Sequence, residues 1–357
     1  MPKYQTVIDW IKKEISDGNL KDGDKLPVER ELCARFELSR QTVRRALDEL
    51  EAGGVISRVQ GSGSYVGTNL KQNISSRERK MNIAVMATFI DSYIFPPVVK
   101  GITGFLNERG YSTQLTFTDD DVIREEEILK ALIETDSIDG LIAEPSKAAL
   151  PNHNIKYYEE LRKRNIPVLF INAQYPGVDI PCIRLDDRGI ACSAVHLLAD
   201  AGFKRIGGIF HGVDEQGHAR YEGYFQGMKE ADLKITDSYV LWLDSVSAGN
   251  LEPLSDYFLS RLKDCQAVIC YNDEIAYQFI RMCRKHGIKV PEDISVVGFD
   301  DADISRRSRP KITTFPHPKD ILGRRAAATM LAMLDDPDAK ADFLYLPEPV
   351  IRNSVKL

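Results

Sequence analysis

Residues 81–357 alternate short apolar runs with stretches of helical periodicity, and no other feature of the sequence limits the possible fold as much. The apolar runs include NIAVMA, STQLTF, PVLFIN, RIGGIF, AVICYN and ISVVGF, and helical patterns such as CSAVHLLADAG lie between them. Strands that alternate with helices form a parallel sheet that is covered by helices on both faces. There are too many units for one small sheet, so the pattern predicts a doubly wound α/β region of two lobes.

We expect the first lobe to comprise about residues 81–174 and 306–330, and the second about residues 175–305 and 331–357. In lobes of this kind, ligands bind beyond the C-terminal ends of the strands. Residues 68–80, TNLKQNISSRERK, are polar and lack periodicity, which is typical of a flexible linker. The linker would join the two-lobed region to a smaller N-terminal domain.

Residues 1–67 have the pattern of that smaller domain. Apolar residues at helical spacing predict a first helix over about residues 4–15, a second helix follows a proline near residues 28–36, and Ser39 is a good N-cap for a third helix. The segments VISRV and SYV on either side of QGSG predict a two-stranded hairpin. Three helices followed by a hairpin make a winged helix-turn-helix.

Composition excludes several classes of protein. The 357 residues carry a formal net charge of −6, which argues against indiscriminate nucleic-acid binding but allows a local basic face. The six cysteines form no C-x-x-C pair and no histidine follows at zinc-finger spacing, so we expect free thiols and no metal site. No apolar run is long enough to span a bilayer, and the N-terminus lacks the pattern of a secretory signal. We therefore expect a cytoplasmic protein with no membrane partner.

The third predicted helix groups three arginines within six residues, away from its apolar stripe. Arg40 and Arg44 are four residues apart and project side by side, and Gln41 and Thr42 lie in the first turn. An arginine can bind guanine in the major groove or hold a phosphate, and recognition helices read bases with their N-terminal residues. A solvated helix face can carry the same residues, but the hairpin favours the DNA-binding interpretation because Gly61 lets the backbone approach a phosphate closely.

The stretch KLPVERELCARFELSRQTVRRALDELEAGGVISRVQGSGSYV resembles the DNA-binding domain of the GntR family of bacterial transcription regulators. In that family the arginine of the P-x-E-R element, the arginine pair of the recognition helix and a glycine at the tip of the wing face DNA. Glu29 either orients an arginine, accepts a hydrogen bond from a cytosine amino group, or only stabilises the start of its helix. We expect DNA contacts from Arg30, Ser39, Arg40, Gln41, Thr42, Arg44, Gln60 and Gly61.

Nearly all of residues 81–357 resembles the effector domain of the LacI family, which shares its fold with periplasmic sugar-binding proteins. The elements CYNDEIA, VPEDISVVGFDD and ITTFPHPKDILGRRAA carry this resemblance. A GntR-type head on a LacI-type body is the layout of the L-arabinose repressors of Gram-positive bacteria, which the segments DSYIFP and GLIAEPSKAAL also resemble. The resemblance implies a homodimer that binds palindromic double-stranded operator DNA and leaves it when the small sugar L-arabinose binds. We expect no cofactor besides this effector.

Polar side chains at the ends of predicted strands are the candidates for sugar contacts. Buried sugar hydroxyls need charged or amide partners, and four such residues directly follow apolar runs. The LacI resemblance implies that an arginine and a histidine also face the ligand, and two aromatic residues are candidates for stacking on its apolar face, although packing is the commoner role of an aromatic. We expect effector contacts from Tyr93, Glu144, Asn172, Arg220, Gln216, Trp242, Asn272, Asp300 and His317.

Other interpretations of these residues stay open at this point. Asn172 could close a turn, Asp273 and Asp301 could cap helices, and we expect His211 and His218 at the surface or at a hinge. We predict that the chain is not an enzyme, because the catalytic motifs G-x-S-x-G and H-E-x-x-H are absent. A solute-binding protein for import would need a signal peptide and no winged head. A regulator that responds to another sugar, or that uses the sugar as a co-repressor, is the closest alternative.

Overall fold

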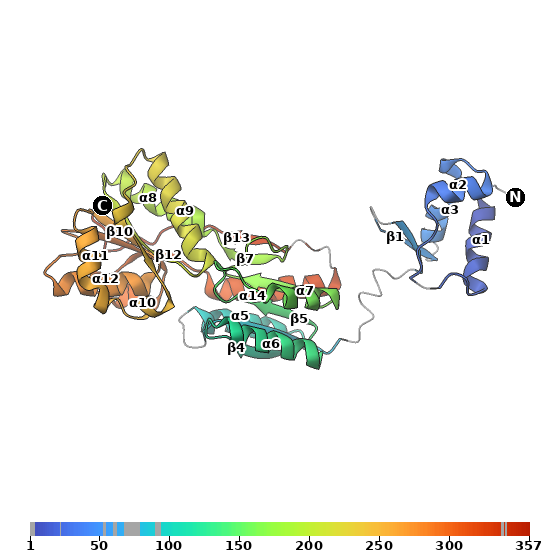
Figure 1. Ribbon diagram of the computed structural model, residues 1–357, viewed down its shortest axis with the longest axis horizontal. Helices are drawn as coiled ribbons and strands as arrows, with labels where there is room; N and C mark the ends of the chain where they lie inside the picture. Colours follow the sequence, from blue (N-terminus) through green and yellow to red (C-terminus); the bar gives the residue numbers. More distant parts are fainter. Residues whose placement is uncertain are drawn as a thin grey trace. The chain divides into compact units, whose positions relative to one another are not determined.

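The computed structural model describes residues 4–21, 23–52, 55–59, 63–67, 79–89, 94–336, 339 and 341–357 (Figure 1). The chain divides into two compact units, Met1–Arg79 and Lys80–Leu357. Most of the predicted linker, residues 68–80, lies outside the described residues. None of the described helices is both long and apolar enough to cross a lipid bilayer.

The first unit consists of three helices followed by a hairpin, which confirms the predicted winged helix-turn-helix. Its elements are α1 (Gln5–Ser16), α2 (Glu29–Phe36), α3 (Arg40–Ala52), β1 (Ile56–Val59) and β2 (Gly63–Val66). The two strands pair antiparallel. Ser39 caps α3 as predicted, because its hydroxyl accepts a hydrogen bond from the backbone N–H of Thr42 at 3.3 Å. The core comprises Val7, Ile8, Ile11, Leu26, Leu32, Val43, Ala46, Leu47, Leu50, Ile56 and Val66.

The second unit contains two parallel sheets, which confirms the two-lobed α/β fold. The sheet of the first lobe has the strand order β13-β7-β6-β5-β3-β4, and each pair of neighbours is parallel. Its strands are β3 (Asn82–Ala87), β4 (Ser112–Phe117), β5 (Gly140–Ala143), β6 (Val168–Ile171), β7 (Cys182–Leu185) and β13 (Phe343–Tyr345). The helices that cover it are α5 (Phe95–Asn107), α6 (Val122–Thr135), α7 (Ile155–Lys163) and α14 (Lys319–Asp335).

Alternating side chains along the strands serve both faces of this sheet. Ile83 and Val85 of β3 belong to the core beneath α5 and α14. Ala84 and Met86, the residues between and after them, belong to the core beneath α6 and α7. The strands are therefore apolar on both faces, which explains why they read as continuous apolar runs in the sequence.

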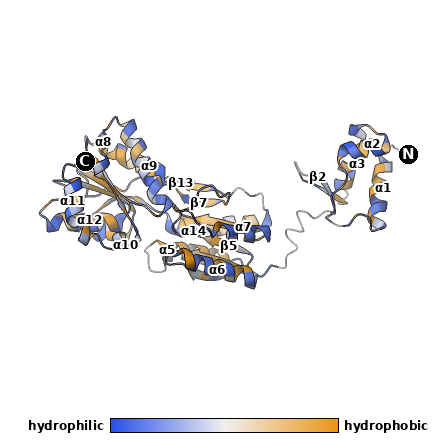
Figure 2. Ribbon diagram, viewed as in Figure 1, coloured by the Kyte–Doolittle hydropathy of each residue, from blue (hydrophilic) through white to orange (hydrophobic). Residues whose placement is uncertain are grey.

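The second lobe repeats this design. Its sheet has the parallel order β12-β11-β10-β8-β9. One face is covered by α8 and α9 and the other by α11 and α12, and in Figure 2 the helices carry hydrophilic and hydrophobic stretches side by side, as amphipathic helices do. The elements are β8 (Ile206–His211), β9 (Val240–Leu243), β10 (Ala267–Cys270), β11 (Ser295–Asp300), β12 (Thr313–Pro316), α8 (Asp187–Asp200), α9 (Glu215–Glu230), α10 (Ser245–Gly249), α11 (Ser255–Leu262), α12 (Asp273–Lys285) and α13 (Asp303–Arg307), with single 3₁₀ turns at Asp237–Tyr239 and Glu252–Leu254.

The chain crosses between the lobes three times, and these crossings correct the lobe boundaries predicted from the sequence. β7 pairs with β6, so the first lobe continues to Leu185 instead of ending near residue 174. β12 pairs with β11 in the second lobe, whereas α14 and β13 belong to the first. The last segment returns to the second lobe, where Val350 pairs with Thr314. β7 and β12 were not among the predicted apolar runs, and an apolar run alone does not identify the sheet that its strand joins, so the sequence did not locate the crossings.

Candidate functional sites

Two exposed arginines of α3 share one carboxylate of α2. Arg40 Nε donates to Glu29 Oε2 at 2.9 Å, and Arg44 Nε donates to Glu29 Oε1 at 3.2 Å. The hydrogen bond from Arg40, together with that from Arg44 and both positive charges, holds the pKa of Glu29 below its usual value. The two arginine side chains are nevertheless 76% and 61% exposed. Of the roles considered for Glu29, the structure supports the orientation of arginines.

The other candidate DNA contacts lie near this pair. Ser39 Oγ lies 2.8 Å from Thr42 Oγ1 in the first turn of α3. Arg30 on α2 and Gln41 on α3 are both exposed. Gln60 and Gly61, which we predicted at the tip of the wing, lie outside the described residues, so their contacts stay predictions.

The third arginine of the cluster is held differently. The guanidinium of Arg45 lies 4.4 Å from the centre of the Tyr4 ring and 3.8 Å from Glu49 one turn along the helix. Arg45 therefore has partners just before α1 and on α3, and it can be compared with the two arginines that share Glu29.

A cavity of about 220 Å³ lies between the two lobes of the second unit. Three carboxylates, one lysine, amides and hydroxyls line it together with apolar side chains, a mixture that suits a small molecule with several hydroxyl groups. The first lobe contributes Thr88, Phe89, Ile94, Phe95, Asp120, Glu144, Pro145, Lys147 and Ala173, and the second lobe contributes His211, Asp214, Gln216, Ser245, Ala248, Tyr271, Asn272 and Ile275.

Three of the predicted effector residues reach the wall of this cavity: Glu144, Gln216 and Asn272. Asn272 has a structural role as well, because its Oδ1 accepts a hydrogen bond from the backbone N–H of Ile275 at 2.9 Å and caps α12. Its neighbour Asp273 is fully buried and accepts a hydrogen bond from the backbone N–H of Ala302 at 2.8 Å, so it joins α12 to the loop after β11.

A chain of buried hydrogen bonds leads from the cavity wall to the crossing between the lobes. Thr88 donates from its backbone N–H and its hydroxyl to Glu144 Oε2. Asn172 Nδ2 donates to Glu144 Oε1 at 2.9 Å, and Asn172 Oδ1 accepts from His317 Nε2 at 3.1 Å. Two further predicted residues, Asn172 and His317, therefore stand one and two hydrogen bonds behind the wall.

Burial shifts the pKa values of both ends of this chain. It raises the pKa of Glu144 to about 7, against the opposing effect of the donors Thr88 and Asn172. It lowers the pKa of His317 to about 4, so this imidazole is neutral at physiological pH. With Nε2 donating to Asn172, Nδ1 of His317 is an acceptor, and it has no partner among the described protein atoms. A buried water can donate to it.

Arg220 and Asp300 are not among the residues that line the cavity. Arg220 is 1% exposed; its Nε donates to Asp187 Oδ1 at 2.7 Å and its Nη2 to Asp300 Oδ1 at 3.5 Å. Its Nη1 donates to the backbone carbonyl of Tyr271, whose ring stacks on His211 in the cavity wall. Arg220 therefore supports the wall through Tyr271, whereas the resemblance to the LacI family implied a direct ligand contact.

Trp242 corrects another prediction. It is 44% exposed on the edge strand β9, and its ring packs against Tyr221 at 5.1 Å and His218 at 5.2 Å between ring centres, away from the lining of the cavity. Val240, two residues earlier and therefore on the same face of β9, is buried, so Trp242 lies where the cover of this face ends. Tyr93, the other predicted stacking residue, lies outside the described residues.

His211 was predicted at the surface or at a hinge, and this was wrong. It is 8% exposed, its Nδ1 lies 3.0 Å from Asp214 Oδ2, and its ring stacks on Tyr271. Tyr271 in turn donates to Asp214 Oδ2 at 2.6 Å. The sequence held a usable signal, because His211 is the last residue of the apolar run RIGGIFH and the strand-end argument that selected Glu144 applies to it equally.

Asp120 and Lys147 line the cavity, although neither was among the ligand contacts predicted from the sequence. Asp119, Asp120 and Asp121 form an acidic run in the sequence; Asp121 caps α6, whereas Asp120 lines the cavity and accepts from the Lys147 backbone N–H at 2.9 Å. Across the cavity, Ser245 donates to Asp120 Oδ2 at 3.1 Å. This hydrogen bond joins the two lobes. Neither Ser245 nor Asp120 directly follows an apolar run in the sequence.

Comparison with known proteins agrees with both units. Residues 3–66 match the model of the bacterial regulatory proteins of the gntR family, and residues 195–355 match the periplasmic binding protein-like domain. Among solved structures, the transcription regulator CcpA of Lactococcus lactis matches with a TM-score of 0.68 at 22% sequence identity, over 77% of this chain and 99% of that chain, which supports the fold alone.

Two relatives match over the full length. An arabinose metabolism transcriptional repressor of Geobacillus stearothermophilus is 36% identical over 363 residues, which cover 100% of this chain and 98% of the relative. A protein of the same name from Halalkalibacterium halodurans is 34% identical over 99% of this chain and 96% of its own length. Both identities extend across the head, the linker and the two-lobed body. The chain therefore belongs to the family of the arabinose metabolism transcriptional repressors.

Proposed function

We propose that this chain binds operator DNA as a homodimer, that L-arabinose binds in the cavity between the lobes, and that the sugar releases the protein from DNA. The observation that carries the proposal is the cavity, because ionisable side chains from both lobes line it. The two full-length relatives named as arabinose repressors support the choice of sugar. No catalytic step is part of the proposal.

The composition of the cavity supports a monosaccharide. Its volume of about 220 Å³ is below the roughly 300–1,000 Å³ of sites for drug-sized ligands. Asp120 and Glu144 can accept from sugar hydroxyls, and Lys147 can donate to them. Phe95 and Ile275 supply apolar surface for the C–H groups of the ring. L-arabinose in particular is proposed because it is the sugar named by the relatives.

The position of the cavity supports a change in lobe geometry as the mechanism. Hydrogen bonds that cross between the lobes include those from Ser245 to Asp120, from Arg184 to Glu215 and from the backbone of Ala149 to that of Val213. A sugar that contacts both walls stabilises the arrangement of lobes in which all its hydroxyls are satisfied, and it shifts the population toward that state. We propose that this state holds the two heads of the dimer at a spacing that does not fit the operator half-sites.

The exposed face of the first unit supports the DNA contact. Arg40 and Arg44 present two guanidinium groups side by side, oriented by Glu29, and Arg30 lies on the preceding helix. Guanidinium groups bind phosphates and the guanine edge in the major groove. Ser39, Gln41 and Thr42 add hydroxyl and amide groups at the start of α3, the end that recognition helices direct at bases.

An electrophoretic mobility shift assay with a promoter duplex of an arabinose-use gene tests this proposal. We expect a shifted complex at low salt, and we expect L-arabinose to weaken it while D-xylose, D-ribose and D-glucose leave it unchanged. Titration calorimetry should give one sugar per chain, and the sugar should be recovered unaltered.

Each alternative has its own signature in this assay. Release by a different pentose would keep the architecture and overturn the ligand. Stronger binding with arabinose would make the sugar a co-repressor. Absence of any shifted complex at low salt, with or without sugars, would overturn the proposed function.

A further inference from the structure

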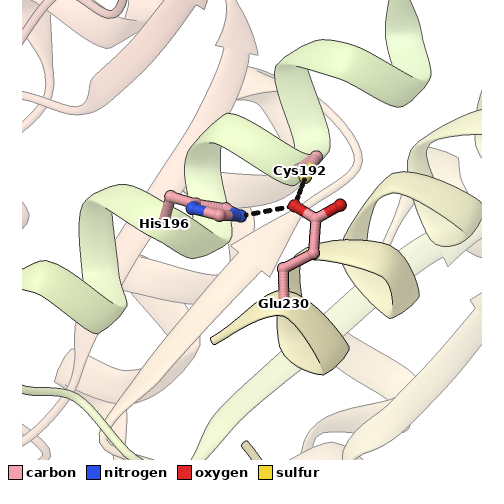
Figure 3. Close-up of side chains that lie close together, drawn as sticks. All are labelled: Cys192, His196 and Glu230. Atoms are coloured by element: carbon pink, nitrogen blue, oxygen red, sulfur yellow. Dashed lines mark hydrogen bonds and ion pairs between the residues drawn. The ribbon is translucent and has the colours of Figure 1, made fainter. Parts of the chain in front are cut away.

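Three side chains that can bind a metal ion meet where α8 lies against α9 (Figure 3). Cys192 and His196 come from α8, and Glu230 comes from the end of α9. Cys192 Sγ donates to Glu230 Oε2 at 3.4 Å, and His196 Nε2 lies 3.0 Å from the same oxygen. Their three ligand atoms lie within 4.8 Å of one another, and within the described part of the chain no second group of three His, Cys, Asp or Glu side chains does so.

The two helices fix this arrangement. Cys192 and His196 are four residues apart and therefore project from the same side of α8. α9 comes close because of Gly227: a Cβ at this position would lie 2.8 Å from Val195 Cβ and 3.0 Å from the Cys192 carbonyl oxygen. Both helices bury their other faces in the core of the second lobe. The three side chains therefore rest on rigid elements while staying partly accessible to solvent.

We propose that Cys192, His196 and Glu230 form a binding site for a divalent ion of the zinc class. Thiolate, imidazole and carboxylate are all zinc ligands, and a sulfur ligand with a histidine disfavours magnesium and calcium. In a tetrahedral site with normal bond lengths, neighbouring ligand atoms are about 3.3–3.6 Å apart. The separations of 3.4 and 3.0 Å to Glu230 are close to this, so small side-chain movements suffice. Water takes the fourth position.

An ion that binds here must replace the thiol proton of Cys192, while neighbouring side chains keep Glu230 in place. In the free cluster the thiol of Cys192 donates to Glu230, and because zinc binds the thiolate, the bound ion replaces this proton. Gln226 donates to Glu230 Oε1 at 2.7 Å and accepts from Arg188 Nε at 2.9 Å. These bonds position the carboxylate and leave Oε2 toward the cysteine and the histidine. A purely hydrogen-bonded cluster would have the same geometry, so the binding of the ion itself distinguishes the two.

The test uses the full-length chain without an affinity tag, reduced and freed of metal with a chelator. Titration with Zn²⁺ should give one ion per chain, and Co²⁺ should produce the ultraviolet charge-transfer band of a cobalt–thiolate bond. Cys192→Ser should abolish that band, and Cys192→Ser and His196→Ala should each weaken zinc binding at least about tenfold.

Two matched controls are available in the chain. Cys33→Ser removes the other partly exposed thiol, and His153→Ala removes a His–Glu pair with a 2.9 Å contact to Glu126 but no cysteine. Both should keep the cobalt band and the zinc affinity of the wild type. A band that survives in Cys192→Ser, or zinc affinity that falls equally in the controls, would overturn the proposed site.

A measurement on the unaltered chain keeps the proposal testable if a variant folds poorly. Iodoacetamide labelling followed by mass spectrometry should show that zinc slows the alkylation of Cys192 by about tenfold or more while the rate at Cys33 is unchanged. Equal rates at Cys192 with and without zinc would rule the site out.

Discussion

Two arginines of the first unit, Arg40 and Arg44, and one of the second unit, Arg220, have opposite surroundings. Arg40 and Arg44 are exposed and share a carboxylate only 11 and 15 residues away in the chain. Arg220 is buried, and its carboxylate partners lie 33 and 80 residues away. The first arrangement leaves positive charge available to a negatively charged partner, whereas the second uses it to neutralise charges inside the fold. The same residue type therefore marks a binding surface in one unit and a structural support in the other.

The largest expected effect of this difference is on stability. Arg220→Ala leaves Asp187 buried without the cation that it pairs with, and breaking a buried pair in this way typically costs about 3–5 kcal/mol. We expect a loss of this size in the free energy of unfolding, measured by urea denaturation of the full-length chain. We also expect sugar binding to weaken, because Arg220 donates to the backbone carbonyl of Tyr271.

Arg188→Ala is the matched control for this variant. Arg188 lies on α8 beside Asp187, but its side chain is exposed and donates to Gln226 at 2.9 Å. Its replacement should change stability by no more than about 0.5 kcal/mol. Equal losses in the two variants would mean that burial of the ion pair is not what distinguishes Arg220.

Glu144 offers a second test inside the cavity, through pH. Its pKa is raised from 4.5 to about 7 in the folded chain, so between these values the folded state binds a proton that the unfolded state releases. The contribution of Glu144 to the free energy of unfolding is therefore greatest below pH 4.5 and falls as the pH rises toward 7. The fall is about 1.4 kcal/mol per pH unit and about 3 kcal/mol in all. Glu144→Gln does not titrate, so the difference in unfolding free energy between wild type and variant should follow this slope.

Urea denaturation of both proteins at pH 5, 6 and 7 measures that slope. Glu126→Gln is the control: hydrogen bonds from His153, Lys130 and Tyr157 lower the pKa of Glu126 to about 2, so its contribution is lost only as the pH falls below 4.5. Across pH 5–7 this control should run parallel to the wild type. A parallel course for Glu144→Gln as well would show that Glu144 is charged in the folded protein at pH 5.

The contrast between the units also explains what could be predicted from the sequence. The helices and hairpin of the first unit follow from local signals, such as the Ser39 cap and the apolar stripe of α3, and the structure confirms them. In the second unit, β3, β4, β6, β8, β10 and β11 were visible as apolar runs, whereas β7, β9, β12 and β13 were not predicted. The sheet that each segment joins was not visible, because pairs such as β13 with β7 bring together strands that lie far apart in the sequence.

The cavity shows the same limit at the level of single residues. Glu144 and Asn272 were found because they follow buried strands, and the same rule would have found His211. Asp120 and Ser245 face one another across 125 residues and follow no apolar run directly, so only the folded chain brings them together. Arg220 was predicted to contact the ligand, whereas the structure pairs it with Asp187 and Asp300, which no local pattern in the sequence links to it.

Arg44→Ala tests the exposed arginines of the first unit, whose positive charge is available to DNA. We expect operator affinity to fall by about 1–3 kcal/mol, with the loss of one guanidinium contact, while sugar affinity stays constant. Mobility shift and calorimetry measure the two affinities. Arg45→Ala is the control, because Arg45 lies against Tyr4 and Glu49, and it should retain most of the operator affinity. Equal loss of DNA and sugar binding in Arg44→Ala would mean that the residue is structural.

The smallest expected effect is the coupling between Glu29 and Arg44 within the free protein. A double-mutant cycle of Glu29→Gln and Arg44→Ala, followed by urea denaturation, should give about 0.2–1 kcal/mol, because an exposed ion pair is well solvated whether or not it forms. The corresponding cycle of Asp187→Asn and Arg220→Ala should give a clearly larger coupling, since the partner left behind there has no water to replace the lost contact. Equal coupling energies in the two cycles would mean that the exposed pair stabilises the fold as much as the buried pair does. The role of Glu29 would then be structural and not the orientation of Arg44 toward DNA.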